Sequence, residues 1–171
     1  MHKRHGLILV LGLMSLCAFG GIFLSAETKP RPQSALSESR VFAYRDWQAT
    51  EYYLHPGDRL VVHARGTWLY SPFVGYHGPA GSRYHLSPAS YPLPNYPGGI
   101  LIGRIGETGV PFPIATHVEQ QTEVAGRLYL RIDDDRVGDN DGALTVEIEV
   151  TRPPSTQPDA QPANTPRASR P

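Results

Sequence analysis

Residues 132–142, IDDDRVGDNDG, gather oxygen-bearing side chains that could hold a cation. Five aspartates and one asparagine share eleven positions, and Gly138 and Gly142 let the backbone turn sharply between them. Ca²⁺ takes roughly six to eight oxygen ligands from carboxylates, amide oxygens and backbone carbonyls. Carboxylates held this close repel one another unless a cation is present. The alternative is a solvated turn in which Asp and Asn side chains bond to their own backbone.

Two alternating segments must position this acidic loop. Leu128, Leu130 and Ile132 alternate with other residues before it, and residues 144–150 alternate in the same way after it. Such a period of two is typical of β-strands with one buried face. A plain hairpin needs only about two to five connecting residues. The connection is therefore longer than chain reversal requires.

Short segments of this kind, separated by glycine and proline, indicate an all-β domain over residues 40–151. Seventeen Gly and seventeen Pro among 171 residues favour turns over long helices. HPGD at 55–58 and GETG at 106–109 are turn sequences, and the glycine pair at 98–99 precedes a short apolar run. A stretch of about 110 residues is long enough for a two-sheet core. We predict a single β-sandwich with no internal repeat.

The N-terminal segment, residues 1–26, predicts export. A basic MHKRH start is followed by an apolar stretch without charge, and Ser25-Ala26 offers a small-residue cleavage site before Glu27. The stretch is also almost long enough to cross a bilayer, so an uncleaved inner-membrane anchor is the alternative to a signal peptide. Either way, we expect the domain outside the cytoplasm, whether periplasmic, secreted or anchored to the inner membrane.

Two polar flanks complete the chain. Residues 27–39 contain proline and few large apolar groups, and residues 152–171 contain six prolines. Such a composition does not bury enough surface to offset chain entropy, so we predict a disordered linker and a disordered Pro-rich tail. The tail is interpreted as a spacer, with a peptide ligand as the alternative.

Composition also argues against several functions. Sixteen basic and sixteen acidic side chains cancel, which leaves no electrostatic basis for a nucleic-acid partner. The single cysteine, Cys17, lies in the N-terminal apolar run, so the domain has neither a disulfide nor a thiol nucleophile. No Gly-x-Ser-x-Gly motif occurs either. We therefore predict that the protein is not an enzyme.

Four segments, in the same order along the chain, resemble the PA-IL-like bacterial lectins. They are HPGDRLVVHARGTWLYSP, HGPAGSRYH, GGILIGRIGETG and LYLRIDDDRVGDNDG, and the resemblance covers residues 41–150. That family consists of calcium-dependent, galactose-binding β-sandwich domains. The resemblance thus implies a jelly-roll or galactose-binding-domain-like sandwich that binds galactose or a related glycan through Ca²⁺.

The resemblance also implies roles for particular residues. Asp134, Asp139 and Asn140 match side-chain calcium ligands, and Tyr70 matches a ligand that acts through its backbone carbonyl. His85 matches a histidine that hydrogen-bonds the sugar, which Asp134 and Asp139 would also contact.

The sequence departs from the family pattern in two places. The loop is shorter after Asp134, so Arg136 or Val137 would have to supply a backbone carbonyl there. Ser87 and Pro88 stand where the family has polar groups that contact the sugar.

Two further expectations concern the surroundings of the site. Residues 68–97 carry five tyrosines that could stack on a sugar, although half-buried strand and loop positions are their ordinary role. Edge strands could pair copies into a homo-oligomer. The competing hypothesis is a calcium-stabilised sandwich that serves the cell envelope as a structural or protein-interaction module and binds no sugar.

Overall fold

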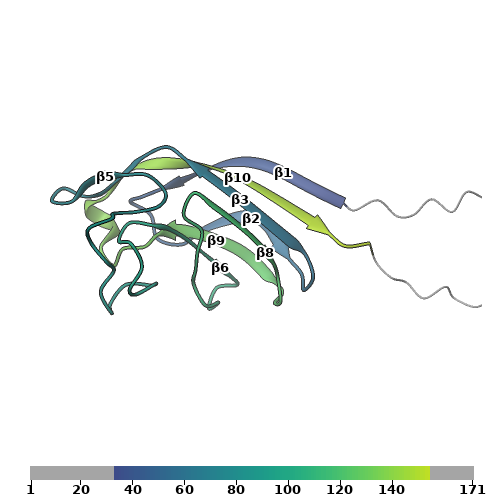
Figure 1. The fold of residues 1–171 in the computed structure, drawn as a ribbon. Coiled ribbons are helices and arrows are strands. Elements are labelled where there is room, and N and C mark those ends of the chain that lie inside the picture. The colour runs from purple at the N-terminus through teal and green to yellow at the C-terminus, as the bar shows by residue number, and fades with distance from the viewer. Residues whose placement is uncertain (1–32, 155–171) are drawn as a thin grey trace, which may run out of the picture.

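The computed structural model describes residues 33–154, and this part of the chain is all-β (Figure 1). The predicted signal or anchor segment, the start of the predicted linker and nearly all of the Pro-rich tail lie outside the described residues. No helix within residues 33–154 has the length and apolar character to cross a membrane. The one helical element described is a short 3-10 turn, η1 (Val137–Asp139), inside the acidic loop.

The strands form two antiparallel sheets. The larger sheet has six strands in the order β5-β4-β10-β3-β8, with β1 also paired to β10. Its strands are β1 (Gln33–Phe42), β3 (Arg59–Arg65), β4 (Trp68–Ser71), β5 (Gly75–His77), β8 (His117–Gln121) and β10 (Asp141–Arg152). The smaller sheet has the order β2-β9-β6-β7. It contains β2 (Gln48–Leu54), β6 (Leu101–Ile105), β7 (Phe112–Pro113) and β9 (Gly126–Ile132).

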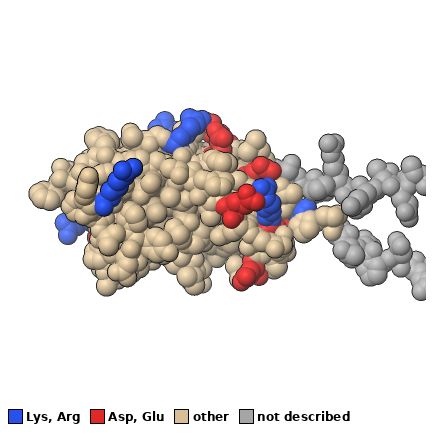
Figure 2. Space-filling model, viewed as in Figure 1, with Lys and Arg blue, Asp and Glu red and all other residues tan. Residues whose placement is uncertain are grey.

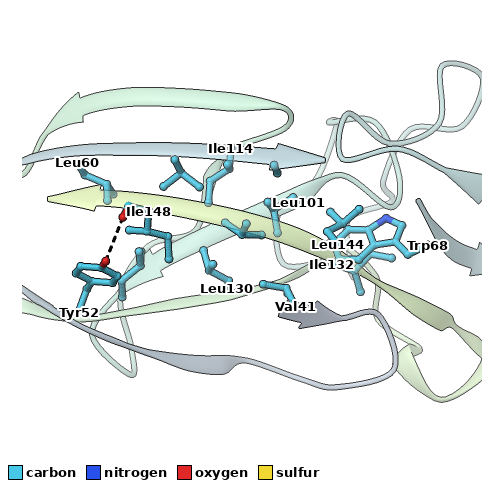
Figure 3. Close-up of a cluster of buried hydrophobic side chains, with 14 of the residues drawn as sticks. Val41, Tyr52, Leu60, Trp68, Leu101, Ile114, Leu130, Ile132, Leu144 and Ile148 are labelled. Carbon is cyan, nitrogen blue, oxygen red and sulfur yellow. Dashed lines mark hydrogen bonds between the residues drawn. The ribbon is translucent and has the colours of Figure 1, made fainter. Parts of the chain in front are cut away.

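Side chains from both sheets meet in one hydrophobic core (Figure 3). The alternation noted in the sequence is confirmed, because Leu128, Leu130 and Ile132 on β9 and Leu144 and Ile148 on β10 are all fully buried. β9 and β10 lie in different sheets, and burial of their apolar faces in one core fixes both ends of the loop that joins them. The acidic loop therefore starts and ends on strands that the core holds in place.

Two further buried groups close the core with hydrogen bonds. Tyr52 donates through its hydroxyl to the carbonyl of Ile148, at 3.1 Å. Trp68, which is fully buried, donates from its indole nitrogen to the carbonyl of Gly99, at 3.0 Å. Each bond satisfies a polar group that would otherwise be buried without a partner.

The prediction that residues 27–39 are disordered is wrong for residues 33–39. They belong to β1, which pairs with β10 from Gln33↔Arg152 to Phe42↔Ala143. An edge strand gains its stability from backbone hydrogen bonds, so it needs few apolar side chains. The composition of this segment therefore did not indicate its structure. Within the described residues, the first strand starts at Gln33 and the last strand ends at Arg152.

The β2–β3 turn is held by a buried carboxylate. Asp58 accepts hydrogen bonds from the backbone N–H of His55, at 2.9 Å, and from the Nε and Nη2 of Arg152, at 3.1 and 3.2 Å. Burial opposes ionisation of Asp58, but the bonds from Arg152 and His55 outweigh it, so the pKa of Asp58 lies below its usual value. The end of β10 is thereby tied to the turn.

Charged side chains are interspersed over the face of the molecule shown in Figure 2. Most of that face is uncharged, and acidic and basic groups lie side by side in some places, while others stand alone. Cross-strand ion pairs of this kind link Arg59 to Glu119, at 2.8 Å, and Arg65 to Glu38, at 2.7 Å. These pairs are exposed, so each contributes little to stability.

Candidate functional site

A pocket of about 490 Å³ separates the acidic loop from the turn between β4 and β5. β5 and η1 lie at the end of the molecule away from the start of β1 and the finish of β10 (Figure 1). The pocket is lined by Tyr70, Ser71, Pro72, Phe73, Val74, Tyr91, Asp134, Asp135, Arg136 and Asp139. Three of the four predicted calcium ligands, Tyr70, Asp134 and Asp139, therefore line the same pocket.

The fourth predicted ligand, Asn140, directly follows the pocket residue Asp139 in the chain. It is buried, and its side-chain carbonyl oxygen has no hydrogen-bond partner within residues 33–154. Its side-chain amide nitrogen lies 3.5 Å from the carbonyl of Ala43, whereas its Oδ1 has no hydrogen-bond partner among the described residues. The residue is only 6% exposed. Buried polar atoms in folded proteins nearly always have a partner, such as protein, water or a bound ion. An amide oxygen is also a good Ca²⁺ ligand, so this atom fits the predicted site.

Asp134 is held in place by its own loop. Its side chain is nearly fully buried, and its Oδ1 accepts a hydrogen bond from the backbone N–H of Arg136, at 2.9 Å. Its backbone carbonyl accepts a bond from the guanidinium of Arg131, which also pairs with Asp46. Burial lowers the pKa of Arg131, although the nearby carboxylates favour its charged form. Arg131 thus places a positive charge beside the loop, and the protein itself offsets part of the carboxylate repulsion.

The remaining negative charge of the acidic loop is not paired by side chains. Among the ion pairs of residues 33–154, none involves an aspartate of residues 132–142. Within the same residues, no three His, Cys, Asp or Glu side chains lie together in a way that could hold a metal ion without other ligands. A calcium site here would therefore need the amide oxygen of Asn140 and a backbone carbonyl, as the family resemblance implies.

Asp133 has a structural role in the loop. It is fully buried, and its two carboxylate oxygens accept hydrogen bonds from Ser87 Oγ, at 2.5 Å, and from the backbone N–H of Leu93, at 2.9 Å. Burial raises the pKa of Asp133, although both hydrogen bonds favour its charged form. Its backbone also bonds to Gly99 and Ile100. Ser87, which marks a departure from the family pattern, thus supports the acidic loop from within.

Tyr70 connects this loop system to the pocket. An added Cβ on Gly98 would lie 2.5 Å from the Tyr70 hydroxyl, and one on Gly99 would lie 2.8 Å from Tyr70 Cγ, so the ring rests directly on the glycine pair. The hydroxyl donates to Tyr91 Oη at 3.0 Å. Burial raises the pKa of both tyrosines, and the charge of Asp134 adds to this effect. Both hydroxyls therefore stay protonated and act as neutral hydrogen-bonding groups.

His85 does not line the pocket. It is exposed, and its Nδ1 is hydrogen-bonded to Ser82 Oγ at 3.1 Å. Its backbone carbonyl accepts from the N–H of Gly98, at 2.8 Å, and Gly98 in turn packs against the ring of Tyr70. Its part in sugar binding stays a prediction.

Phe73 is a pocket residue that the sequence motifs did not indicate. It lies in the turn between β4 and β5 and is 92% exposed, facing the same pocket as the carboxylates. An exposed phenylalanine forgoes the roughly 1.5–3 kcal/mol that burial would supply, and exposed apolar surface beside a pocket can mark a binding site. Its position within a Ser-Pro-Phe-Val-Gly turn, where polar residues are usual, was the available signal.

Comparison with known proteins relates this architecture to a lectin fold. No protein-family model matches the chain, and no curated protein sequence matches it. Among solved structures, the N-terminal domain of EclA, described as a PllA-like lectin, superimposes with a TM-score of 0.52 at 20% identity. The match covers 66% of this chain and 94% of that one. The described domain thus has the fold of a PllA-like lectin domain, with two antiparallel β-sheets.

Proposed function

We propose that this domain binds carbohydrate through a Ca²⁺ ion held in the acidic pocket, with galactose or a related hexose as the leading ligand. Asp134, Asp139 and Asn140 would supply side-chain oxygens, and Tyr70 its backbone carbonyl. The observation that carries the proposal is the buried, unpartnered Oδ1 of Asn140, which follows directly after pocket residue Asp139. The lectin fold of the EclA domain supports the choice of a sugar as the ligand.

The pocket offers what a neutral sugar needs besides the ion. Bound Ca²⁺ can take adjacent sugar hydroxyls in place of water. Asp134 and Asp139 could accept hydrogen bonds from the same hydroxyls. Phe73 presents an exposed aromatic ring, which could stack on the apolar face of a pyranose. Neutral Tyr91, which also lines the pocket, could donate or accept one more hydrogen bond.

A purely structural calcium site is the competing proposal, and the contacts of the acidic loop argue against it. Asp133 already ties the loop to residues 87–100, and Arg131 already binds the carbonyl of Asp134. A loop with these supports needs no ion merely to stay folded. Carboxylates of the loop that form no ion pair instead line the open pocket together with Phe73.

The test is calorimetry of the full domain with calcium, with chelator and with galactose or a glycan panel. We expect Asn140→Ala to weaken calcium and sugar binding together, because it removes an oxygen ligand without adding a charge. Asp141→Asn is the matched control, because Asp141 is exposed in the same loop and does not line the pocket. Calcium binding without any calcium-dependent glycan binding would leave the structural site as the better explanation.

Calcium should also stabilise the fold. At a free concentration of about a hundred times its Kd, the ion would add roughly 2.7 kcal/mol to the free energy of unfolding. A thermal melt in calcium and in chelator measures this shift, and identical melts would contradict a calcium site.

We further propose that the protein is exported and that it binds rather than catalyses. The export proposal rests on residues 1–26, and intact-mass measurement distinguishes a cleaved chain that starts near Glu27 from an anchored one. Size-exclusion chromatography with light scattering would test the expected homo-oligomer.

A further inference from the structure

A second group of residues suited to ligand binding lies on the smaller sheet, outside the acidic pocket. The guanidinium of Arg104, on β6, lies 4.2 Å from the ring centre of Trp47 and 5.2 Å from that of Tyr129. Tyr129 is the cross-strand partner of Arg104 on β9, and Trp47 directly precedes β2. Arg104 is thus held between two aromatic rings, by contacts made across three strands or their ends.

Arg104 has no polar partner in residues 33–154. No hydrogen bond or ion pair of its guanidinium is formed there, and its Nε is buried without an acceptor. The neighbouring arginines are different, because Arg131 pairs with Asp46 and Arg127 donates to the carbonyl of Thr50, at 2.8 Å. Leaving a charged donor buried and unbonded is costly. Stacking therefore orients the guanidinium of Arg104 while its donors remain unused.

The charged groups near Arg104 leave it without an anionic partner. Arg131 lies beside the same Trp47 ring, with its guanidinium 5.4 Å from the ring centre. Asp46 is paired with Arg131, and Glu107 lies 3.5 Å from the hydroxyl of Tyr129. No carboxylate of the described residues lies within ion-pair distance of Arg104. A carboxylate brought by a ligand would supply an acceptor for the terminal nitrogens of Arg104, which have no partner among the described residues.

We propose that Arg104, between Trp47 and Tyr129, binds the carboxylate of an acidic saccharide, such as a hexuronate residue, at a second site that needs no calcium. The planar fork of arginine fits a carboxylate with two parallel hydrogen bonds. Trp47 and Tyr129 are each partly exposed and can contact the apolar face of the sugar ring. The choice of a saccharide as the carrier of the carboxylate rests on the proposed function, whereas recognition of the anion does not.

The experiment titrates the full-length protein with galacturonic acid trisaccharide in the presence of chelator. Galactotriose, which has no carboxylate, is the neutral control ligand. The chain has two tryptophans, and Trp68 is fully buried, so a fluorescence change on binding is expected from Trp47. Calorimetry gives the affinity independently. We expect the acidic trisaccharide to bind with chelator present and the neutral one not to bind.

Two variants of Arg104 separate geometry from charge. Arg104→Gln should weaken binding about tenfold or more, because it removes a charge-assisted bidentate contact. Arg104→Lys keeps the charge but loses the planar fork, so it should recover only part of the affinity. Arg127→Gln is the matched control, because it removes the same charge from the same strand as Tyr129 while its donor is already engaged. It should change the affinity less than threefold, because Arg127 is exposed and salt screens the effect of its charge.

Three results would overturn the proposal. They are no binding of the acidic trisaccharide, equal losses in Arg104→Gln and Arg127→Gln, and inorganic phosphate binding as tightly as the trisaccharide. Calcium-dependent binding of neutral sugar and the thermal melt of each variant show whether the fold is intact. Because the acidic ligand is tested in chelator and the neutral ligand in calcium, failure of one site is distinguishable from failure of the other.

Discussion

Replacing Gly98 by alanine should disturb the pocket from behind. A Cβ at this position would lie 2.5 Å from the hydroxyl oxygen and 2.8 Å from the Cζ of Tyr70. Ordinary contacts between carbon and these atoms are about 3.5 Å, so the Tyr70 ring would have to move by roughly 1 Å. The ring has little freedom to do so, because its hydroxyl bonds to Tyr91 and its side chain is only 6% exposed.

The expected cost follows from two opposing terms. Overpacking a well-filled core costs about 1–3 kcal/mol. Replacing glycine stabilises by about 0.4–1 kcal/mol, because the unfolded chain loses freedom. We therefore expect Gly98→Ala to lower the free energy of unfolding by about 1–2 kcal/mol. It should also weaken calcium binding, since Tyr70 carries the backbone carbonyl assigned to the ion.

Gly138→Ala is the matched control within the acidic loop. A Cβ there would meet nothing within 4 Å, and the backbone does not adopt the left-handed conformation. Its effect should be neutral or stabilising, by at most about 1 kcal/mol. Urea unfolding of both variants measures the difference. Equal stabilities for the two variants would refute the inference that Tyr70 rests on the glycine backbone.

Two further predictions concern buried carboxylates. Asp58→Asn should cost about 1–2 kcal/mol at neutral pH, a value reduced because Arg152 is half exposed. The pKa of Asp58 is lowered by folding, so its contribution is present above about pH 4 and is lost as the pH falls through the folded-state pKa. The gap between variant and wild type in urea should therefore narrow at low pH, and a gap that widens would contradict the assignment. Ser87→Ala should cost about 1–3 kcal/mol, because the buried carboxylate of Asp133 loses one of its two hydrogen-bond donors and keeps only the backbone N–H of Leu93. Faster amide exchange across residues 87–99 would accompany that loss, and unchanged exchange would argue against an anchoring role for Asp133.

The sequence was most informative where structure is local. The alternation of Leu128 to Ile132 and of residues 144–150 predicted two core strands, and both are present. It also placed Asp134 and Asp139 together on the loop between those strands, because positions this close in the chain cannot separate far. By contrast, composition misjudged residues 33–39, whose pairing with β10 depends on backbone groups that a side-chain pattern does not report.

By itself, then, the sequence determined that an all-β domain presents a dense acidic loop, since period-two alternation and charge density can be observed over a few residues. Only the tertiary structure decided which distant groups surround that loop. It brought Phe73 to the acidic pocket, set Ser87 against Asp133, and left His85 outside the pocket lining. It also stacked Arg104 between Trp47 and Tyr129. These contacts depend on strand register between segments far apart in the chain, and register follows from how the whole core packs.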